Sequence, residues 1–415
     1  MIVVGGTYRE VCVRPDWNYL AGSGLRAAAA LSGRAATGIV TLHTAVDERM
    51  NEEAELVYDA LGVTRAVIER DEPVEFRFFT PLSHPAVSGP NASMEDLNAE
   101  ADTALVFGLI ESGHRRVAAD RIVLDPQQPR DLKPLKLDGL VADELIVVAN
   151  STEVRKLAGN IADPSEATKE LLNQGVDAVV MKGGASGCDV TWLDGGELRF
   201  AHVGAHPTRS VWPVGSGDVF SAGFSYALHS GADIVQAARV ASASAAHWCS
   251  TKVPAVPPAI LRGELSGSGL PDPMPERPGP KARVYLAGPF FSTSELWLVD
   301  VVRRSLLALG VDVFSPVHDV GLGGLEVAEA DLAGLAACSG VLALFDGADP
   351  GTIFEIGWAV KAGIPVVGFA DRLDAEGTKM LEGSGVELHR DLSSAAYRSA
   401  WVAMGAAVVP GWVTK

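Results

Sequence analysis

Short apolar runs alternate with helical patterns along the first 150 residues of the chain. The runs that predict strands are Ile2–Val4, Gly38–Thr44, Ala104–Leu109, Arg121–Asp125 and Glu144–Ala149. Between the first two, the segment Ala21–Leu31 has a glycine turn followed by an Ala-rich helical pattern. Strands that alternate with helices are typical of an α/β fold with a mainly parallel sheet.

The same pattern continues with a strand at Ala178–Met181 and an Ala-rich helix at Ile234–Trp248. Pro73–Thr80 alternates differently, because Val74, Phe76 and Phe78 fall on one face. This segment predicts an edge strand. Together with residues 9–20 it predicts a small β lid, and an ordinary hairpin is the alternative.

The pattern breaks between Glu264 and Lys281, where Ser-Gly-Ser-Gly is followed by five prolines in ten residues. No periodic element survives such proline density, so the segment predicts an extended linker. We therefore predict one domain at residues 1–263, a linker at 264–281 and a second domain at 282–415.

The second domain repeats the alternation on a smaller scale. Its predicted strands are 282–287, 312–316, 341–345 and 364–369, and its predicted helices are 293–309, 327–337 and 354–362. This succession predicts a compact Rossmann-like α/β domain with a core of its own.

Composition limits the partners. The chain has 34 Lys and Arg residues against 52 Asp and Glu residues, a formal net charge of −18, which argues against non-specific nucleic-acid binding. The apolar runs are too short to cross a bilayer, and the N-terminus lacks the basic region of a signal peptide. The four cysteines are scattered without C-x-x-C spacing, which fits a reducing cytoplasm and predicts neither a disulfide framework nor a zinc site, so no metal-ligating residues are predicted.

The stretch Pro213–Phe224 is the strongest candidate for chemistry. Gly215 and Gly217 flank Ser216, Asp218 follows, and a helical run begins there. The start of a helix favours phosphate, and a carboxylate beside it can accept a proton from an alcohol. This combination is what phosphoryl transfer to a hydroxyl requires. The alternative is a glycine turn with an acid near a helix start.

This stretch resembles the G-A-G-D signature of the ribokinase-like (PfkB) sugar and nucleoside kinases, with Ser216 in place of alanine. Asn150–Glu153 resembles the N-x-x-E element of that family, and Val180–Gly187 its glycine segment beside the nucleotide. The resemblance implies a three-layer kinase domain with a β lid, ATP and Mg²⁺ as cofactors, and Asp218 as the base. The nucleotide-binding residues that it implies are Gly215, Ser216, Gly217, Asn150, Glu153, Lys182, Gly184 and Gly187.

The acceptor side matches the kinases less well. Gly22 and Gly24 fit the family's G-G-x-x-x-N turn, but the asparagine is missing and Leu25 and Arg26 lie nearby. Glu10 and Asp16 are two candidates for the aspartate that binds sugar hydroxyls in the family. The alternative for each is an ordinary surface carboxylate, because acids are rarely buried.

Two segments of the second domain carry candidate chemistry. Val284–Ser292 runs from a strand into a glycine-proline turn, and Asp346–Trp358 runs from a strand into a helix. Carboxylates at strand ends facing one crevice can handle the hydroxyls and anomeric carbon of a sugar. The alternative for Glu355 is a capping box formed with Thr352, which needs no chemistry.

Both segments resemble the nucleoside 2-deoxyribosyltransferase family. The resemblance implies Glu355 as the nucleophile at the anomeric carbon, Tyr285 as its orienting partner, and Asp349 and Asp331 as groups that bind sugar hydroxyls or assist at the base. The substrate-contacting residues implied by the opening segment are Gly288, Ser292 and Ser294. With Arg304, the two serines are candidates for a phosphate site, which favours N-glycosidases of nucleoside 5′-monophosphates.

The two resemblances imply a bifunctional cytoplasmic enzyme of nucleoside or nucleotide metabolism, active on small molecules and forming a homodimer. One half phosphorylates a sugar or nucleoside hydroxyl, and the other cleaves an N-glycosidic bond. The alternative is base exchange with a kinase-like domain kept for nucleotide sensing. The segment 402–415 lacks the asparagine that transferases lend to a neighbouring subunit, which weakens base exchange. Either half could act first.

Overall fold

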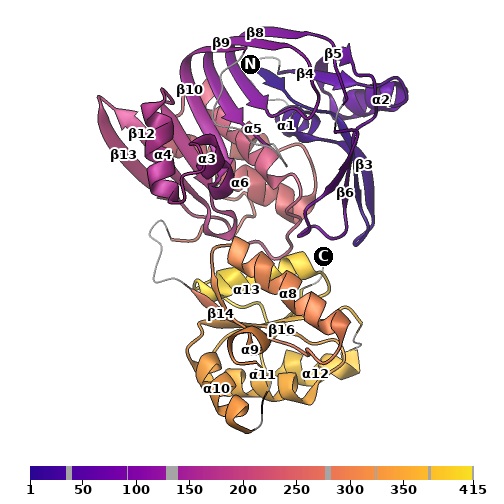
Figure 1. The fold of residues 1–415 in the computed structure, drawn as a ribbon, viewed down its shortest axis with the longest axis vertical. Coiled ribbons are helices and arrows are strands. Elements are labelled where there is room, and N and C mark those ends of the chain that lie inside the picture. The colour runs from indigo at the N-terminus through magenta and orange to yellow at the C-terminus, as the bar shows by residue number, and fades with distance from the viewer. Residues whose placement is uncertain are drawn as a thin grey trace. The chain divides into compact units, whose positions relative to one another are not determined.

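The computed structural model describes residues 1–33, 40–90, 92–127, 139–275, 282–321, 323, 325–372 and 375–413. The chain divides into two compact units (Figure 1). The first contains residues 1–183, 187–206 and 213–270, and the second contains 184–186, 207–212 and 271–415. The predicted linker has no helix or strand from 264 to 275, and residues 276–281 lie outside the described part.

A nine-stranded mixed sheet forms the centre of the first unit, in the order β13-β12-β11-β10-β9-β8-β1-β4-β5. Its strands are β1 (Ile2–Val4), β4 (Thr41–Val46), β5 (Thr64–Glu69), β8 (Leu97–Phe107), β9 (Arg115–Asp125), β10 (Leu140–Asn150), β11 (Ala178–Lys182), β12 (Cys188–Asp194) and β13 (Glu197–Val203). β5 to β11 in this order are parallel, and β12 and β13 are antiparallel to their neighbours.

Helices cover both faces of this sheet, as its buried residues require. Leu145 to Ala149 of β10 are all buried, so neither face of that strand meets solvent. α3 and α4 pack against β10 and β11, and α1 and α5 pack against β1, β4 and β8 (Figure 1). The helices of this unit are α1 (Ser23–Leu31), α2 (Asn51–Leu61), α3 (Ser151–Leu157), α4 (Pro164–Asn173), α5 (Ser216–His229), α6 (Ile234–Thr251) and α7 (Pro258–Leu261). The predicted three-layer α/β domain is confirmed.

The predicted β lid is also confirmed, as a separate four-stranded sheet in the order β3-β2-β6-β7. Its strands are β2 (Tyr8–Cys12), β3 (Trp17–Ala21), β6 (Glu75–Phe78) and β7 (Ala86–Ser88). The prediction of an edge strand at 73–80 was wrong, because β6 pairs with β2 on one side and β7 on the other. Alternation reports which face of a strand is buried and carries no information about its two edges.

The second unit has an all-parallel six-stranded sheet in the order β15-β14-β16-β17-β18-β19. Its strands are β14 (Arg283–Ala287), β15 (Asp312–Phe314), β16 (Gly340–Leu344), β17 (Val366–Phe369), β18 (Glu387–His389) and β19 (Gly411–Trp412). Its helices are α8 (Thr293–Ala308), α9 (Pro316–Asp319), α10 (Leu325–Ala336), α11 (Pro350–Ala362), α12 (Ala375–Gly383) and α13 (Leu392–Ala403). This order is that of flavodoxin-like sheets and confirms the predicted Rossmann-like domain; such sheets bind ligands where the strand order reverses, between β14 and β16 here.

A buried ion-pair cluster holds the last strands of this unit together. Glu387 accepts hydrogen bonds from Arg398 Nε (2.6 Å), His389 Nε2 (2.7 Å) and the amide of Val409 (2.8 Å). Although burial opposes it, these bonds lower the pKa of Glu387 from 4.5 to about 2. The cluster therefore stabilises the fold above about pH 4.5, and this stability is lost as the pH falls towards 2.

Within the described ranges, no helix has the length and apolar character needed to cross a membrane.

Candidate functional sites

The first candidate site lies at the start of α5. Gly215 has a left-handed conformation (φ 78°) and precedes the first helical residue, Ser216. Asp218 is in the first turn and is buried. A Cβ atom on Gly217 would lie 3.4 Å from Lys182 Nζ, so this lysine is close to the backbone of the glycine turn. A helix start with an adjacent ammonium group is suited to a phosphate.

A fully buried carboxylate holds Lys182 in place. Asp125, the last residue of β9, accepts hydrogen bonds from Lys182 Nζ (2.7 Å) and Ser221 Oγ (2.7 Å) through the same oxygen. Burial raises the pKa of Asp125 to about 7, and the charge of Lys182 opposes this rise. The other oxygen of Asp125 is buried with no hydrogen-bond partner among the described residues.

Arg26 of α1 joins the two carboxylates that were predicted separately. Its Nη1 donates to Asp218 Oδ2 and its Nη2 donates to Glu10 Oε2, and all three side chains are buried. Gln127 Nε2 donates to the other oxygen of Asp218. Gln127 has φ 33°, a conformation that costs energy in a non-glycine residue and is often found at functional sites.

Burial of Arg26 is accompanied by close packing. A Cβ atom on Gly215 would lie 2.2 Å from the guanidinium carbon, so only glycine leaves room for this side chain. The guanidinium also lies 5.2 Å from the ring centre of Trp248. Desolvation disfavours the charged form of Arg26, but Glu10 and Asp218 outweigh it and raise the pKa of this guanidinium. Desolvation raises the pKa of Glu10.

Asn150 and Glu153, the predicted N-x-x-E element, form a capping box at the start of α3. Asn150 Oδ1 accepts from the Glu153 amide at 2.9 Å, and Glu153 Oε2 accepts from the Asn150 amide at 2.8 Å. Glu153 still raises the pKa of Asp125 by its charge. The element is therefore a helix cap whose carboxylate lies within electrostatic reach of the Lys182–Asp125 pair.

The other predicted residues of the kinase site are dispersed. Gly22 donates its amide to Glu10 Oε1 at 3.2 Å, and Gly24 packs so closely on Gly5 that a Cβ atom would lie 2.4 Å from its carbonyl. Asp16 is exposed in the turn between β2 and β3 and has no hydrogen bond to Glu10, Arg26 or Asp218 in the described structure. Gly187 has φ 101° beside β13, whereas Gly184 belongs to the second unit.

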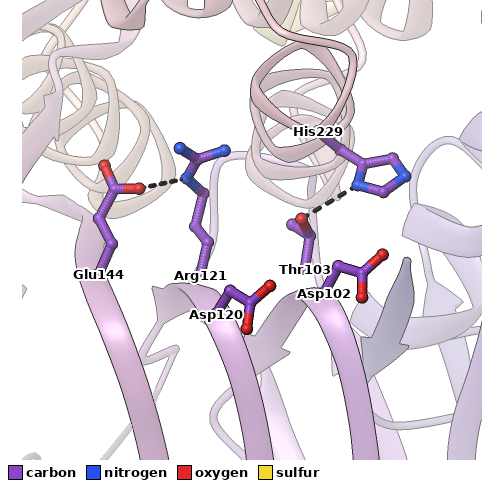
Figure 2. A pocket seen from close by; sticks show the side chains of 6 residues that line it. All are labelled: Asp102, Thr103, Asp120, Arg121, Glu144 and His229. Atoms are coloured by element: carbon purple, nitrogen blue, oxygen red, sulfur yellow. Dashed lines mark hydrogen bonds and ion pairs between the residues drawn. The ribbon is translucent and has the colours of Figure 1, made fainter.

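An open pocket of about 300 Å³ lies elsewhere on the first unit (Figure 2). It is lined by Asp102, Thr103, Asp120, Arg121, Glu144 and His229. His229 is the last residue of α5, about 16 Å along the helix from Asp218. Most of its polar groups are already paired, since His229 Nδ1 lies 3.0 Å from Thr103 Oγ1 and Arg121 Nε donates to Glu144 at 2.5 Å. In the described ranges no cluster of metal-ligating side chains is found.

The second candidate site lies where Tyr285, in the middle of β14, meets Glu355 of α11. The hydroxyl of Tyr285 donates to Glu355 Oε1 at 2.6 Å. Burial raises the pKa of Glu355 to about 7, against the effect of this hydrogen bond and with further contributions from Asp331 and Asp349. Tyr285 stacks on Phe314 with ring centres 5.5 Å apart, which fixes the ring that orients Glu355.

Two aspartates surround this pair. Asp331 lies on α10, where burial raises its pKa, and its Oδ1 is buried without a hydrogen-bond partner in the described structure. Asp349 caps α11, since its Oδ2 accepts from the amide (2.8 Å) and the hydroxyl (3.1 Å) of Thr352. The structure thus brings together all four residues predicted for this site.

The capping-box alternative for Glu355 is wrong. The helix starts at Pro350, so Thr352 is already its third residue and Glu355 lies in the second turn. Asp349 provides the cap in place of Thr352. The side chain of Glu355 accepts a hydrogen bond from Tyr285, so it does not cap the helix.

The residues predicted for a phosphate are less concentrated. Ser292 caps α8 in a capping box with Glu295, and its hydroxyl lies 3.1 Å from that of Ser294. Gly288 packs against Leu344, which a Cβ atom would approach to 3.0 Å. Arg304 pairs with Asp300. Arg304 lies about 18 Å along the helix from Ser292, so one phosphate cannot touch both Arg304 and Ser292.

Sequence reasoning missed four side chains of the first site: Arg26, Gln127, Asp125 and Ser221. Two of them had a signal. Arg26 stands in the place of the missing asparagine, and Asp125 is an acid at the end of an apolar strand, where α/β sheets bind ligands. Gln127 and Ser221 had no signal, because amides and hydroxyls are common in loops and helices.

Comparison with known proteins agrees with both halves. Residues 78–257 match the pfkB family carbohydrate kinases, and residues 284–389 match the family named nucleoside 2-deoxyribosyltransferase. An uncharacterised sugar kinase of Archaeoglobus fulgidus is 29% identical over 128 residues, which is 31% of this chain and 49% of that protein. The match therefore spans about half the length of this relative.

Solved structures give weaker likenesses. Ribokinase of Thermotoga maritima is 14% identical over 64% of this chain and 99% of its own, with a TM-score of 0.45. Phosphofructokinase-2 of Escherichia coli in complex with potassium is 13% identical over 65% of this chain and 98% of its own, with a TM-score of 0.46. The two sequence matches carry the assignment: residues 78–257 are a pfkB family carbohydrate kinase domain, and residues 284–389 are a nucleoside 2-deoxyribosyltransferase domain.

Proposed function

We propose that the second unit cleaves the N-glycosidic bond of a nucleoside or nucleoside 5′-monophosphate with Glu355 as nucleophile. One observation carries this proposal: a carboxylate in the second turn of α11 is held by the Tyr285 hydroxyl and plays no part in capping the helix. A buried tyrosine that fixes one oxygen leaves the other available for attack on the sugar.

The chemistry follows from these groups. Glu355 Oε2 attacks the anomeric carbon, the bond from that carbon to the base nitrogen breaks, and its electron pair leaves with the base. Asp331 has a raised pKa and a buried, unpaired oxygen, so it can carry the proton that the departing base takes up. Water then attacks the anomeric carbon of the glycosyl ester and gives a proton back to Asp331, and the bond to Glu355 breaks, which releases the sugar or sugar 5-phosphate and restores both residues.

Cleavage should become faster as the pH rises through about 7, because only the ionised Glu355 can attack and burial raises its pKa to about 7. Well below that pH, the rate should change about tenfold per pH unit. The measurement is base release under kcat/KM conditions across this range. Loss of the Asp331 proton would lower the rate at the upper end of the range, so only a rate that does not rise with pH anywhere below about 7 would exclude Glu355 as the nucleophile.

Tyr285→Phe should move this midpoint to higher pH. The tyrosine hydroxyl stabilises the ionised carboxylate, so its loss leaves desolvation unopposed. A hydrogen bond to a charged group contributes about 1.5–3 kcal/mol, which corresponds to about one to two pH units. Tyr397→Phe on α13 is the matched control and should leave the profile in place. An unchanged midpoint in Tyr285→Phe would mean that the hydroxyl does not act on Glu355.

We also propose that the first unit transfers a phosphoryl group from ATP to a hydroxyl of a sugar or nucleoside. The support is the meeting of the α5 start, Lys182 and the buried Asp218 at one glycine turn. Asp218 would take the proton of the acceptor hydroxyl, and Lys182 with the amides of the turn would hold the phosphate.

The residues present fit ATP and Mg²⁺. ATP would supply the phosphoryl group, and Mg²⁺ would neutralise phosphate charge. Because Mg²⁺ is held largely by phosphates and water, it needs only one or two carboxylates, and Glu153 would provide one. Asp125 has one oxygen without a hydrogen-bond partner among the described residues, and it lies close enough to Glu153 for the charge of Glu153 to raise its pKa.

A single experiment tests both halves. A panel of nucleosides and nucleoside 5′-monophosphates is incubated with and without ATP, and base release and ADP formation are read together. Base release with water as acceptor supports hydrolysis, and base exchange with an added second base supports the transferase alternative. ATP binding without ADP formation on every acceptor would favour a sensing role for the kinase domain.

We further propose that the protein works on small molecules in the cytoplasm as a homodimer. Phe291, Trp297 and Phe354 of the second unit are each exposed by half or more of their surface, and aromatic residues are enriched at protein interfaces. Light scattering across a range of concentrations tests this, and a monomer throughout would exclude the dimer.

A further inference from the structure

Arg26 pairs with Glu10 and Asp218, the two carboxylates that are expected to contact the acceptor in the kinase site. We propose that the guanidinium of Arg26 occupies the position of the acceptor. An uncharged compound with a hydroxyl group must displace this guanidinium from Glu10 and Asp218 in order to bind. The inference rests on the proposed kinase function and specifies the acceptor class of that site.

Hydrogen bonds within the protein occupy both oxygens of Asp218 and both oxygens of Glu10. Asp218 accepts from Arg26 at one oxygen and from Gln127 at the other. Glu10 accepts from Arg26 at one oxygen and from the Gly22 amide at the other. Every carboxylate oxygen expected to contact the acceptor therefore has a partner within the protein. An acceptor hydroxyl reaches Asp218 only by replacing one of these donors.

Close packing holds Arg26 beside the glycine turn. The guanidinium fills the space against Gly215, where a Cβ atom would lie 2.2 Å from its carbon, so it adjoins the turn that would hold the transferred phosphoryl group. Trp248 is 5.2 Å away and is itself fixed by a hydrogen bond from Nε1 to the carbonyl of Val214 (2.8 Å). Arg26 is thus a built part of the site and not a surface side chain that happens to reach it.

Charge decides which acceptor can compete. Glu10, Arg26 and Asp218 together carry a net charge of −1 when all are ionised, in a buried place where like charges repel strongly. A sugar phosphate or another acid would add negative charge to this cluster. Lys182 lies within electrostatic reach of Asp218, but it is paired with Asp125 on the phosphate side. An uncharged polyol or nucleoside is therefore favoured.

The chemical step is then complete. The acceptor oxygen forms a bond to the transferred phosphorus, the bond from that phosphorus to the bridging oxygen of ATP breaks, and ADP leaves. The hydroxyl proton passes to Asp218, which must have released Arg26 to receive it. An uncharged nucleoside phosphorylated in this way is a nucleoside monophosphate, the class of compound proposed as substrate for the second unit.

The test compares Arg26→Asn and Arg26→Lys with the wild type on pentoses, nucleosides and their 5′-phosphates. Arg26→Asn should lower KM for the uncharged acceptors about tenfold, while the KM for ATP should change by less than about threefold. Arg26→Lys keeps the charge and should retain a high KM. The matched control is Arg65→Asn. Arg65 also bridges two carboxylates, Glu55 and Asp59, and lies over the ring of Tyr58, but it is far more exposed than Arg26.

Three results would overturn the inference. A lower kcat with unchanged acceptor KM in both variants would place Arg26 on the transferred phosphoryl group. A higher KM for phosphorylated acceptors alone would make Arg26 the receptor of an anionic group. An unchanged KM in Arg26→Asn would mean that Arg26 and the acceptor do not compete.

A second measurement does not depend on phosphoryl transfer and so separates this inference from the proposed function. Without Arg26, Glu10 and Asp218 face each other with no cation between them, so Arg26→Asn should lose more stability at about pH 8 than at about pH 5. The double variant Arg26→Asn with Glu10→Gln removes the repulsion and should lose most of this pH dependence. If no variant phosphorylates anything but this pattern is found, the kinase function fails while the occupancy by Arg26 stands. A stability loss independent of pH would overturn the inference itself.

Discussion

Glu355→Gln is expected to lower N-glycosidic cleavage by a factor on the order of 10³ or more, because an amide cannot attack the anomeric carbon. Folding should survive, since glutamine can still accept the hydrogen bond from Tyr285. The folded-state pKa of Glu355 is raised to about 7, so its ionisation costs the wild type stability as the pH rises through that value. The variant should therefore match the wild type in acid and be the more stable protein above about pH 7.

The measurement is base release together with thermal unfolding at two pH values on the same preparation. Glu387→Gln is the matched control, because it replaces another buried glutamate of the same unit that lies in a different cluster. Breaking that ion pair should cost about 3–5 kcal/mol of stability while folded molecules keep their cleavage rate. Near-normal base release by Glu355→Gln would remove the main support for a glycosidase.

Asp218→Asn is expected to reduce phosphoryl transfer by a factor of about 10² to 10⁴, the usual contribution of a positioned base. ATP binding should change little, because Lys182 and the turn before α5 are untouched. The measurements are acceptor-dependent ADP formation and the KM for ATP. Retention of more than about half of the wild-type rate would make Asp218 an ordinary acid at a helix start.

Asp47→Asn serves as the control for that variant. Asp47 is also a buried aspartate paired with a buried arginine, Arg70, at 2.9 Å. Both substitutions remove the charge of a buried ion pair, so they should destabilise the unit to a comparable extent. Only Asp218→Asn should lose phosphoryl transfer. Equal losses of activity in the two would attribute the effect to stability.

Much of the fold was predictable, because buried parallel strands are nearly continuous apolar runs between helical patterns. β1 was predicted to the residue, and β14 and β16 to within one. The hairpin of β12 and β13 was missed, although Gly195 and Gly196 both have positive φ and Gly-Gly is a known two-residue turn signal. β12 alternates buried and partly exposed residues only weakly, so its pattern alone did not predict a strand.

The candidate sites were predictable to different extents. Glu355 and Tyr285 are 70 residues apart, and only the family pattern related them before their hydrogen bond was seen. Arg26 is 192 residues from Asp218, and nothing local to either residue predicts that they meet. Propensity and periodicity report on neighbours in the chain, whereas a buried ion pair is decided by how whole elements pack.

The cluster around Glu387 also holds the end of the described chain in place. Arg398 Nη2 donates to the carbonyl of Ala407 at 2.7 Å, and the Val409 amide donates to Glu387, so these late residues are tied to a buried ion pair. β19 then adds the final strand to the sheet. The Val413 amide donates to the carbonyl of Leu388 at 2.9 Å, so a fluorescent label attached at residue 413 would report from a fixed point on the second unit, and distances measured to it would need little averaging over the motion of a tether.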